Sequence, residues 1–237
     1  MNSFTMTMKS RAALSDTEVA ECATLFSAHY GVWSARGPRP GARVAMSPAM
    51  LRRSCLFDDN CGAVLLRASV GGGPGELVGH AFFRRFEFGG APAAAAAAAA
   101  AGPAVWVTQL VVASGARGRR VASTMLLQLC ARDVVAVGLL SSHPHAVRAL
   151  EHAAARRCSR EGVAAAAAAL AVAAQVPYFR AGDVDVEGGR CVARTGFFVD
   201  HAEVNAILAS SATAAGGRAF ELGPLGEGEE FIAAVFF

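Results

Sequence analysis

Hydrophobic residues follow two spacings along this chain, and the spacing predicts the order of its helices and strands. A recurrence every three or four residues, as in Val19, Ala23 and Phe26, is typical of a helix with one apolar face. Short apolar runs bounded by glycine or proline are typical of strands. The pattern predicts helices over 16–30, from 48, over 121–132, from 144 and over 201–210, and strands over 62–70, 77–88, 104–112, 133–142, 191–199 and 229–237. A strand-helix-strand unit at the centre of this order indicates a mixed α/β sheet.

The same pattern divides the chain into one domain and less regular segments. Nine consecutive alanines precede Pro103, and an isolated alanine run this short is marginal as a helix in water. A second alanine-rich stretch (162–175) either extends the helical region or forms a separate surface helix. The expected organisation is a disordered start (1–15) and a single domain (16–237), with a core (16–160), a low-complexity loop (91–103), an insertion whose structure the sequence leaves open (161–190) and a tail of strands and a helix (191–237).

Composition and charge exclude several classes of function. The 237 residues carry a net charge of +3, which is too slight to indicate a nucleic-acid partner. The six cysteines show neither CxxC nor Cys-His zinc spacing, so free thiols in a reducing compartment and no metal are expected. No run is apolar enough to span a membrane. We therefore expect a cytoplasmic protein without membrane partners, although Lys9 and Arg11 in an acid-free start leave an organelle-targeting segment open.

The stretch WVTQLVVASGARGRRVASTMLLQLC (106–130) carries the candidate chemistry. An apolar strand leads into a turn with three arginines around Gly118, and an amphipathic helix follows. Backbone N–H groups at such a junction can surround an anion, glycine allows close approach, and arginine pairs with phosphate oxygens. We name Arg117, Gly118, Arg119 and Arg120 the arginine turn, and it predicts an anionic ligand; the alternative is a solvated basic turn.

The strand, turn and helix resemble the acetyl-CoA-binding motif of the GNAT superfamily of N-acetyltransferases, which reads Arg/Gln-x-x-Gly-x-Gly/Ala. Arg117 and Ala122 match this motif, whereas Arg120 stands where the central glycine is usual. The segment SSHPHAVRALEHA (141–153) also resembles the family's following strand end and helix. The resemblance implies a GNAT-like fold that binds acetyl-CoA as acyl donor, and it implies the binding residues Leu110, Val111, Val112, Arg117, Gly118, Arg119, Arg120, Val121, Ala122 and Ser123.

The implied reaction is acetyl transfer to an amine acceptor by direct attack in a ternary complex. Such enzymes often use a Glu on the fourth strand and a Tyr on the helix after the fifth, but this chain offers Gln109 on that strand and Leu150 at the tyrosine position. We expect Gln109 to orient a water and His143 to act as base, with Ser141 or Ser142 as its hydrogen-bonding partner. Neither the acceptor nor the oligomeric state follows from the sequence.

Two other functions compete with this interpretation. The missing Glu and Tyr, together with Arg120, fit a GNAT-like module that binds acyl-CoA without catalysis. The segment HAEVNAIL (201–208) resembles the His-Ala-Glu motif of zinc-dependent deaminases, but no cysteine follows Cys191 to complete a zinc site. We therefore interpret His201 and Glu203 as the first turn of an ordinary helix.

Overall fold

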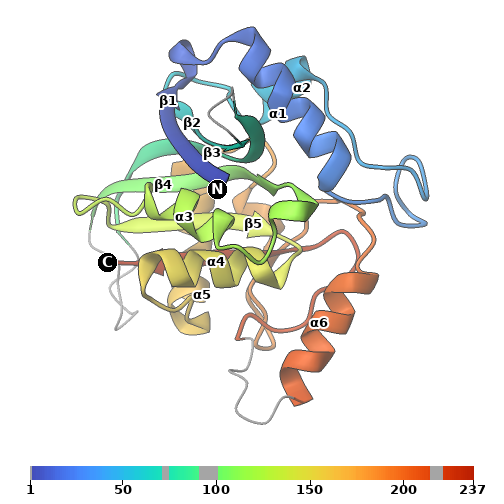
Figure 1. Cartoon of the computed structure of the whole chain (residues 1–237). Coiled ribbons are helices and arrows are strands. Elements are labelled where there is room, and N and C mark those ends of the chain that lie inside the picture. The colour runs from blue at the N-terminus through green and yellow to red at the C-terminus, as the bar shows by residue number, and fades with distance from the viewer. Residues whose placement is uncertain (1, 71–74, 91–100, 214–220) are drawn as a thin grey trace.

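A computed structural model describes residues 2–70, 75–90, 101–213 and 221–237, and these form one mixed sheet with helices on both faces (Figure 1). The sheet has the order β1-β2-β3-β4-β5-β8-β7-β6, in which β4 and β5 are parallel and the other pairs antiparallel. Its strands are β1 (Asn2–Ser10), β2 (Cys61–Val70), β3 (Glu76–Phe88), β4 (Gly102–Val112), β5 (Ala136–Ser141), β6 (Val184–Asp185), β7 (Val192–Ala193) and β8 (Glu230–Phe236). The mixed α/β class predicted from the sequence is confirmed.

The helices begin and end where local sequence signals place them. Ser15 and Glu18 form a reciprocal capping box at the start of α1, and Ser47 caps α2 ahead of Pro48. The helices are α1 (Asp16–His29), α2 (Pro48–Ser54), α3 (Val121–Leu127), α4 (Pro144–Ala154), α5 (Arg160–Ala174) and α6 (Ala202–Thr213), and the short 3-10 helices are η1 (Arg11–Ala13), η2 (Ser114–Ala116) and η3 (Ala181–Asp183). In Figure 1, α6 projects from the body of the molecule.

The alternation of side chains along β3 separates the helices onto two faces of the sheet. Phe82 packs in a cluster with residues of α1 and α2, whereas Phe83 belongs to the cluster that contains residues of α3 and α4. Arg84 points to the same face as Phe82, and its Nη1 donates to the carbonyl of Ala174 at the end of α5 over 2.9 Å. Helices α1, α2 and α5 therefore cover one face, and α3 and α4 cover the other.

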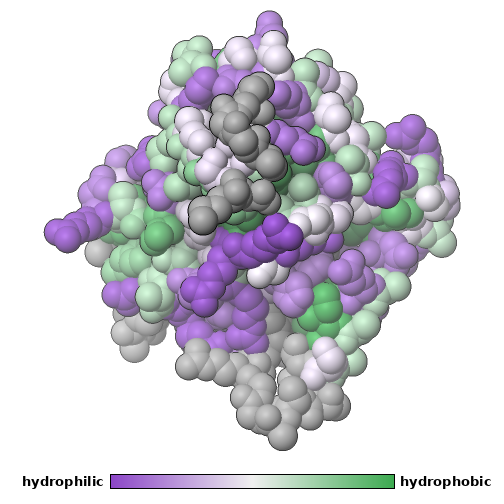
Figure 2. All heavy atoms as spheres, viewed as in Figure 1, coloured by the Kyte–Doolittle hydropathy of each residue, from purple (hydrophilic) through white to green (hydrophobic). Residues whose placement is uncertain are grey.

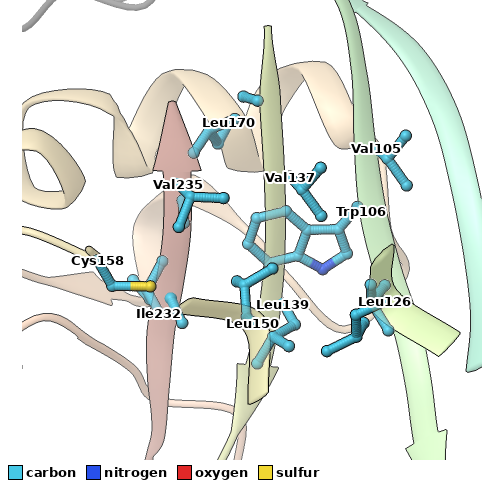
Figure 3. Packing of buried hydrophobic residues seen from close by; sticks show 14 of the residues in the cluster. Val105, Trp106, Leu126, Val137, Leu139, Leu150, Cys158, Leu170, Ile232 and Val235 are labelled. Carbon is cyan, nitrogen blue, oxygen red and sulfur yellow. The ribbon is translucent and has the colours of Figure 1, made fainter. Parts of the chain in front are cut away.

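Trp106 fills the core where β4 and β5 run side by side. Figure 3 shows its indole ring beside β5, among side chains from neighbouring strands and helices. The ring stacks on Phe179 with 4.5 Å between centroids. Room for it exists because β5 has Gly138 there: a Cβ at this position would lie 2.4 Å from Cζ3 of Trp106. The absence of a side chain at Gly138 thus leaves the space beside β5 that the Trp106 ring occupies.

Several sequence expectations need correction. The segment 1–15 was expected to be disordered, but within it residues 2–10 form β1, which pairs with β2 along its whole length. The first part of the segment 161–190, whose structure the sequence leaves open, belongs to α5. The small alanine side chains of this helix let it pack closely against the sheet. The strand expected over 191–199 is only two residues long, and the helix expected over 121–132 ends at Leu127. Of the loop expected over 91–103, residues 91–100 lie outside the described residues, and β4 begins at Gly102.

We predict that Gly138→Ala lowers the free energy of unfolding by about 1–3 kcal/mol, because overpacking forces Trp106 from its position. Urea unfolding followed by tryptophan fluorescence measures the change. Gly182→Ala is the matched control, since a Cβ there meets no atom within 4 Å. Equal stability of the two variants would contradict this account of the core.

Candidate functional site

The site begins where β4 and β5 separate. Their parallel pairing runs from Ala104 to Val107 of β4 and goes no further. On the other side of β4, Phe82 pairs with Gln109 and Phe83 with Val107, so Thr108 is an extra residue in β4, a β-bulge. A bulge bends its strand and increases the local twist. The strands consequently diverge from Thr108 onward, while β3 and β4 stay paired to Val112.

The divergence leaves one edge of β4 facing a cleft. The N–H of Ala113 donates to the carbonyl of Val78, and pairs along an antiparallel ladder alternate between hydrogen-bonded and non-hydrogen-bonded. Val111 therefore pairs with β3, whereas the backbone groups of Leu110 and Val112 point away from β3. Of the three strand residues expected to bind the cofactor, these two present peptide groups to the cleft.

The arginine turn lies at the end of this edge and has a left-handed backbone at two positions. Gly118 has φ of 73°, and Arg120 has φ of 61° and ψ of 14°. The left-handed region costs residues with a Cβ about 1–2 kcal/mol, so it favours glycine. Arg120 thus occupies, in a glycine-like conformation, the position where the resembled motif has its central glycine.

The arginine side chains are available to an anion. Arg117, Arg119 and Arg120 are exposed, and none forms an ion pair with an acidic side chain among the residues that the structure describes. Arg117 donates from Nη2 to the carbonyl of His29 at the end of α1 over 2.6 Å, which holds the turn against that helix. Hydrophilic residues gather at the centre of the face shown in Figure 2, over α3, α4 and the loop before α3.

The first residues of α3 fix the turn from the other side. Val121 is buried and packs close to Gly79 of β3, where an added Cβ would lie 3.0 Å from it. The hydroxyl of Ser123 donates to the carbonyl of Arg120 over 2.9 Å. Ala122 and Ser123 line the cleft, so the predicted cofactor segment borders one space at every residue except Arg119.

The cleft has a volume of about 880 Å³ and extends from the arginine turn, past the edge of β4, to the side of α1 and the tail. The predicted catalytic residues Gln109, Ser142 and His143 all line it. Apart from Arg119, the sequence-predicted site residues therefore all line one cleft.

His143 is poorly arranged to accept a proton from a ligand. Its Nδ1 accepts the N–H of His145 over 3.2 Å as the N-cap of α4, which assigns the proton of the neutral ring to Nε2. Nε2 faces Glu203, with 3.8 Å to its Oε1. Burial and the neighbouring His145 lower the pKa of His143. The single basic lone pair of this ring is thus already engaged by the backbone.

Gln109 is also committed to protein partners. Its side chain is 8% exposed, and its Oε1 lies 2.8 Å from Nε2 of His80, which donates to it. Burial lowers the pKa of His80 to about 4, so this ring is neutral at pH 7. The Gln109 amide nitrogen contacts Sδ of Met46 and Sγ of Cys55. Ser142 is buried, and of the two serines expected as partners of His143 it is Ser141 whose Oγ accepts a hydrogen bond, from the backbone N–H of His143.

Two groups that sequence reasoning did not select complete the far end of the cleft. Tyr178, in the segment after α5, donates its hydroxyl proton to the carbonyl of Thr108 at the bulge. Glu230, the first residue of β8, is 6% exposed, and burial raises its pKa to about 7. The one available signal for Glu230 was an acidic residue at the start of an apolar strand.

The rival histidine motif does not assemble a metal site. His201 is buried directly before α6, and Glu203 lies on its first turn. Within residues 2–70, 75–90, 101–213 and 221–237, no three His, Cys, Asp or Glu side chains are grouped so that they could hold a metal ion. None of the helices in these ranges is both long and apolar enough to cross a membrane.

The chain matches no family model. It also has no match among curated proteins. Solved structures do resemble it. Agmatine N-acetyltransferase, in the apo form of a variant, is 12% identical over 98% of this chain and 99% of that one, with a TM-score of 0.45. The ribosomal-protein-S18-alanine N-acetyltransferase from Escherichia coli is 11% identical over 64% of this chain and 75% of that one, with a TM-score of 0.37.

A third similar structure is the GNAT-like decarboxylase GphF in complex with isobutyryl-CoA, which is 16% identical over 58% of this chain and 65% of that one, with a TM-score of 0.35. The structural neighbours thus include GNAT-type proteins, the superfamily that the arginine turn resembles. At these identities and TM-scores the likeness does not extend to an activity.

We predict that Arg120→Gly raises the free energy of unfolding by about 1 kcal/mol, because glycine adopts the left-handed conformation without steric cost. Arg119→Gly is the matched control: it removes the same side chain at a neighbour without positive φ, and it should be neutral or destabilising. Chemical denaturation of both variants measures the difference. A less stable Arg120→Gly protein would show that the arginine makes contacts that outweigh the strain.

The stability of the folded protein is expected to depend on pH through Glu230. Because the folded-state pKa is raised from 4.5 to about 7, the folded protein loses stability as pH rises through this window and the buried carboxyl ionises. Gln does not ionise, so the stability of Glu230→Gln relative to the natural chain should improve by up to about 3 kcal/mol between pH 4.5 and pH 8. Thermal unfolding across this range provides the measurement, and a pH-independent difference would place the pKa of Glu230 at its ordinary value.

Proposed function

We propose that this protein is an acyl-CoA-dependent N-acyltransferase that moves an acetyl group from acetyl-CoA to an amine by direct attack in a ternary complex. The observation that carries the proposal is the free edge of β4, which ends at the arginine turn. A ligand that suits both features joins an amide-containing arm to a pyrophosphate, and CoA has this construction. The arm would add to β4 as a short strand does, through Leu110 and Val112.

The pyrophosphate would lie against Arg117, Gly118, Arg119 and Arg120, with the first amides of α3 at Val121, Ala122 and Ser123. Arginine forks pair with phosphate oxygens, and these exposed guanidinium groups form no ion pair with an acidic side chain among the described residues. The thioester would then lie near the point where β4 and β5 part, between Thr108 and Ser142. Gln109 and His143 would shape the walls there, since both are anchored by protein contacts.

The six cysteines support the proposal of a cytoplasmic enzyme. All six are free thiols in the structure, and Cys22, Cys55, Cys61, Cys158 and Cys191 are buried. Unpaired buried thiols are typical of proteins from a reducing compartment. The chemistry proposed for the chain needs no metal, and the acceptor is assigned only as an amine.

We predict that isothermal titration detects micromolar binding of acetyl-CoA, and that Arg117→Ala weakens it about tenfold through loss of a charged fork. Arg132→Ala is the control, because Arg132 is an exposed arginine outside the cleft. Release of CoA thiol with a panel of amines then separates an enzyme from a module that only binds acyl-CoA. Failure of millimolar acetyl-CoA to bind would contradict the proposed function altogether.

A further inference from the structure

Glu230 lies at the junction of the two strands that form the far wall of the cleft. The pairing of β5 with β8 ends at Ser141 and Phe231, and Glu230 comes one residue beyond that pair. It is therefore placed beside the carboxyl end of β5, next to Ser142. Both residues line the cleft. A carboxyl group at this place is close to where the thioester of the proposed donor would lie.

The carboxyl of Glu230 is buried with little to compensate a charge. Its partner is the hydroxyl of Thr195, and that oxygen already accepts the N–H of Phe197 over 3.3 Å, so its own proton is free to be donated to Glu230. Among the described residues, Glu230 forms no ion pair with a lysine, arginine or histidine. A buried carboxylate without a cation is costly, so this one is suited to a cation that arrives with a ligand.

The groups around Glu230 come from several elements. Tyr30 at the end of α1, Tyr178 after α5 and Cys55 line the same cleft as Glu230. The charge of Glu230 is among the causes that raise the pKa of each tyrosine, after burial. The proton of Tyr178 is used on Thr108, which leaves the carboxyl facing the cleft among neutral groups.

We propose that Glu230 is the proton acceptor for the amine substrate, which enters the cleft as an ammonium ion and is deprotonated by this carboxylate. The inference rests on the proposed function. It assigns the base to the start of β8, and it replaces the expectation that His143 fills this role. His143 has its lone pair on the His145 N–H, and Gln109 cannot accept a proton at neutral pH.

The proposed step moves two protons from the ammonium nitrogen and exchanges one C–S bond for one C–N bond. One ammonium proton moves to a Glu230 oxygen, and the nitrogen lone pair then attacks the thioester carbon, forming the C–N bond. The C–S bond breaks, and the second proton lost from nitrogen leaves with the sulfur as CoA thiol. Glu230 returns its proton to solvent. The net change is ammonium plus acetyl-CoA to amide, CoA thiol and one proton, with no oxidant or further reactant.

The environment of Glu230 suits this task. Burial, opposed by the Thr195 hydrogen bond, raises the pKa of the carboxyl to about 7. A base with a pKa close to the working pH is both available and strong enough to take a proton. An ammonium ion beside it would stabilise the charged form and lower this pKa.

The test uses the full-length protein with acetyl-CoA and three probe amines: n-propylamine, 2-phenylethylamine and glycinamide. Glu230→Gln should bind acetyl-CoA with a Kd within twofold of the natural chain. Its kcat/KM for the best amine should fall at least about 100-fold, and the inflection near pH 7 in the profile should disappear. Glu87→Gln is the matched control, because Glu87 is an exposed carboxylate on β3 outside the cleft.

A second readout does not depend on turnover. The carboxyl ¹³C signal of Glu230, assigned by its loss in Glu230→Gln, should titrate near pH 7 and shift to lower pH when one of the amines is saturating. If acetyl-CoA does not bind, the proposed function fails. If it binds and amines are acetylated, but Glu230→Gln keeps activity within threefold, only the role of Glu230 is overturned. The role is also overturned if no amine turns over and none shifts this titration.

Discussion

The site depends on the early end of the pairing between β4 and β5. Parallel strands ordinarily exchange hydrogen bonds along their shared length, and an unpaired edge inside a sheet would leave backbone groups without partners. Here the bulge at Thr108 turns β4 away from β5 after Val107. The hydroxyl of Tyr178 donates to the Thr108 carbonyl, which lies beyond the pairing with β5. The backbone bulge and this one side-chain contact thus hold the two strands apart.

The same contact links the cleft to the hydrophobic core. Phe179 stacks on Trp106, and Trp106 lies where β5 has Gly138 in place of a side chain. Because Tyr178 is adjacent to Phe179, this stack fixes the backbone from which the tyrosine hydroxyl reaches β4. Arg84 strengthens the arrangement by binding the carbonyl at the end of α5 and Asp58 together. The alanine-rich helix therefore has a role that its composition alone does not suggest: it brings the Tyr178 segment to the cleft.

Local signals in the sequence were sufficient to predict most of the fold and the side of the cleft formed by β4, the arginine turn and α3. Apolar spacing, the Ser15 and Ser47 caps and the arginine turn all depend on residues within a few positions of one another, so helix starts and the strand-turn-helix segment could be predicted. The residues 2–10 could not, because their strand is stabilised by pairing with β2, some sixty residues away in the chain. The places of Tyr178 and Glu230 in the cleft could not be predicted for the same reason, since only tertiary packing brings them to Thr108 and Ser142.

The two ends of the cleft have opposite electrostatic character, and this polarity gives the site its direction. Within the part of the chain that the structure describes, exposed arginines without acidic partners mark one end, whereas a buried carboxyl without a cationic partner marks the other. Both arrangements cost stability: Arg120 holds a left-handed backbone, and the buried Glu230 lacks the hydration that would stabilise its ionised form. An anion at the turn and a cation at Glu230 would each relieve one of these costs. The same two features that destabilise the free chain are therefore those that would bind a negatively charged donor and a positively charged acceptor on either side of the Thr108 bulge.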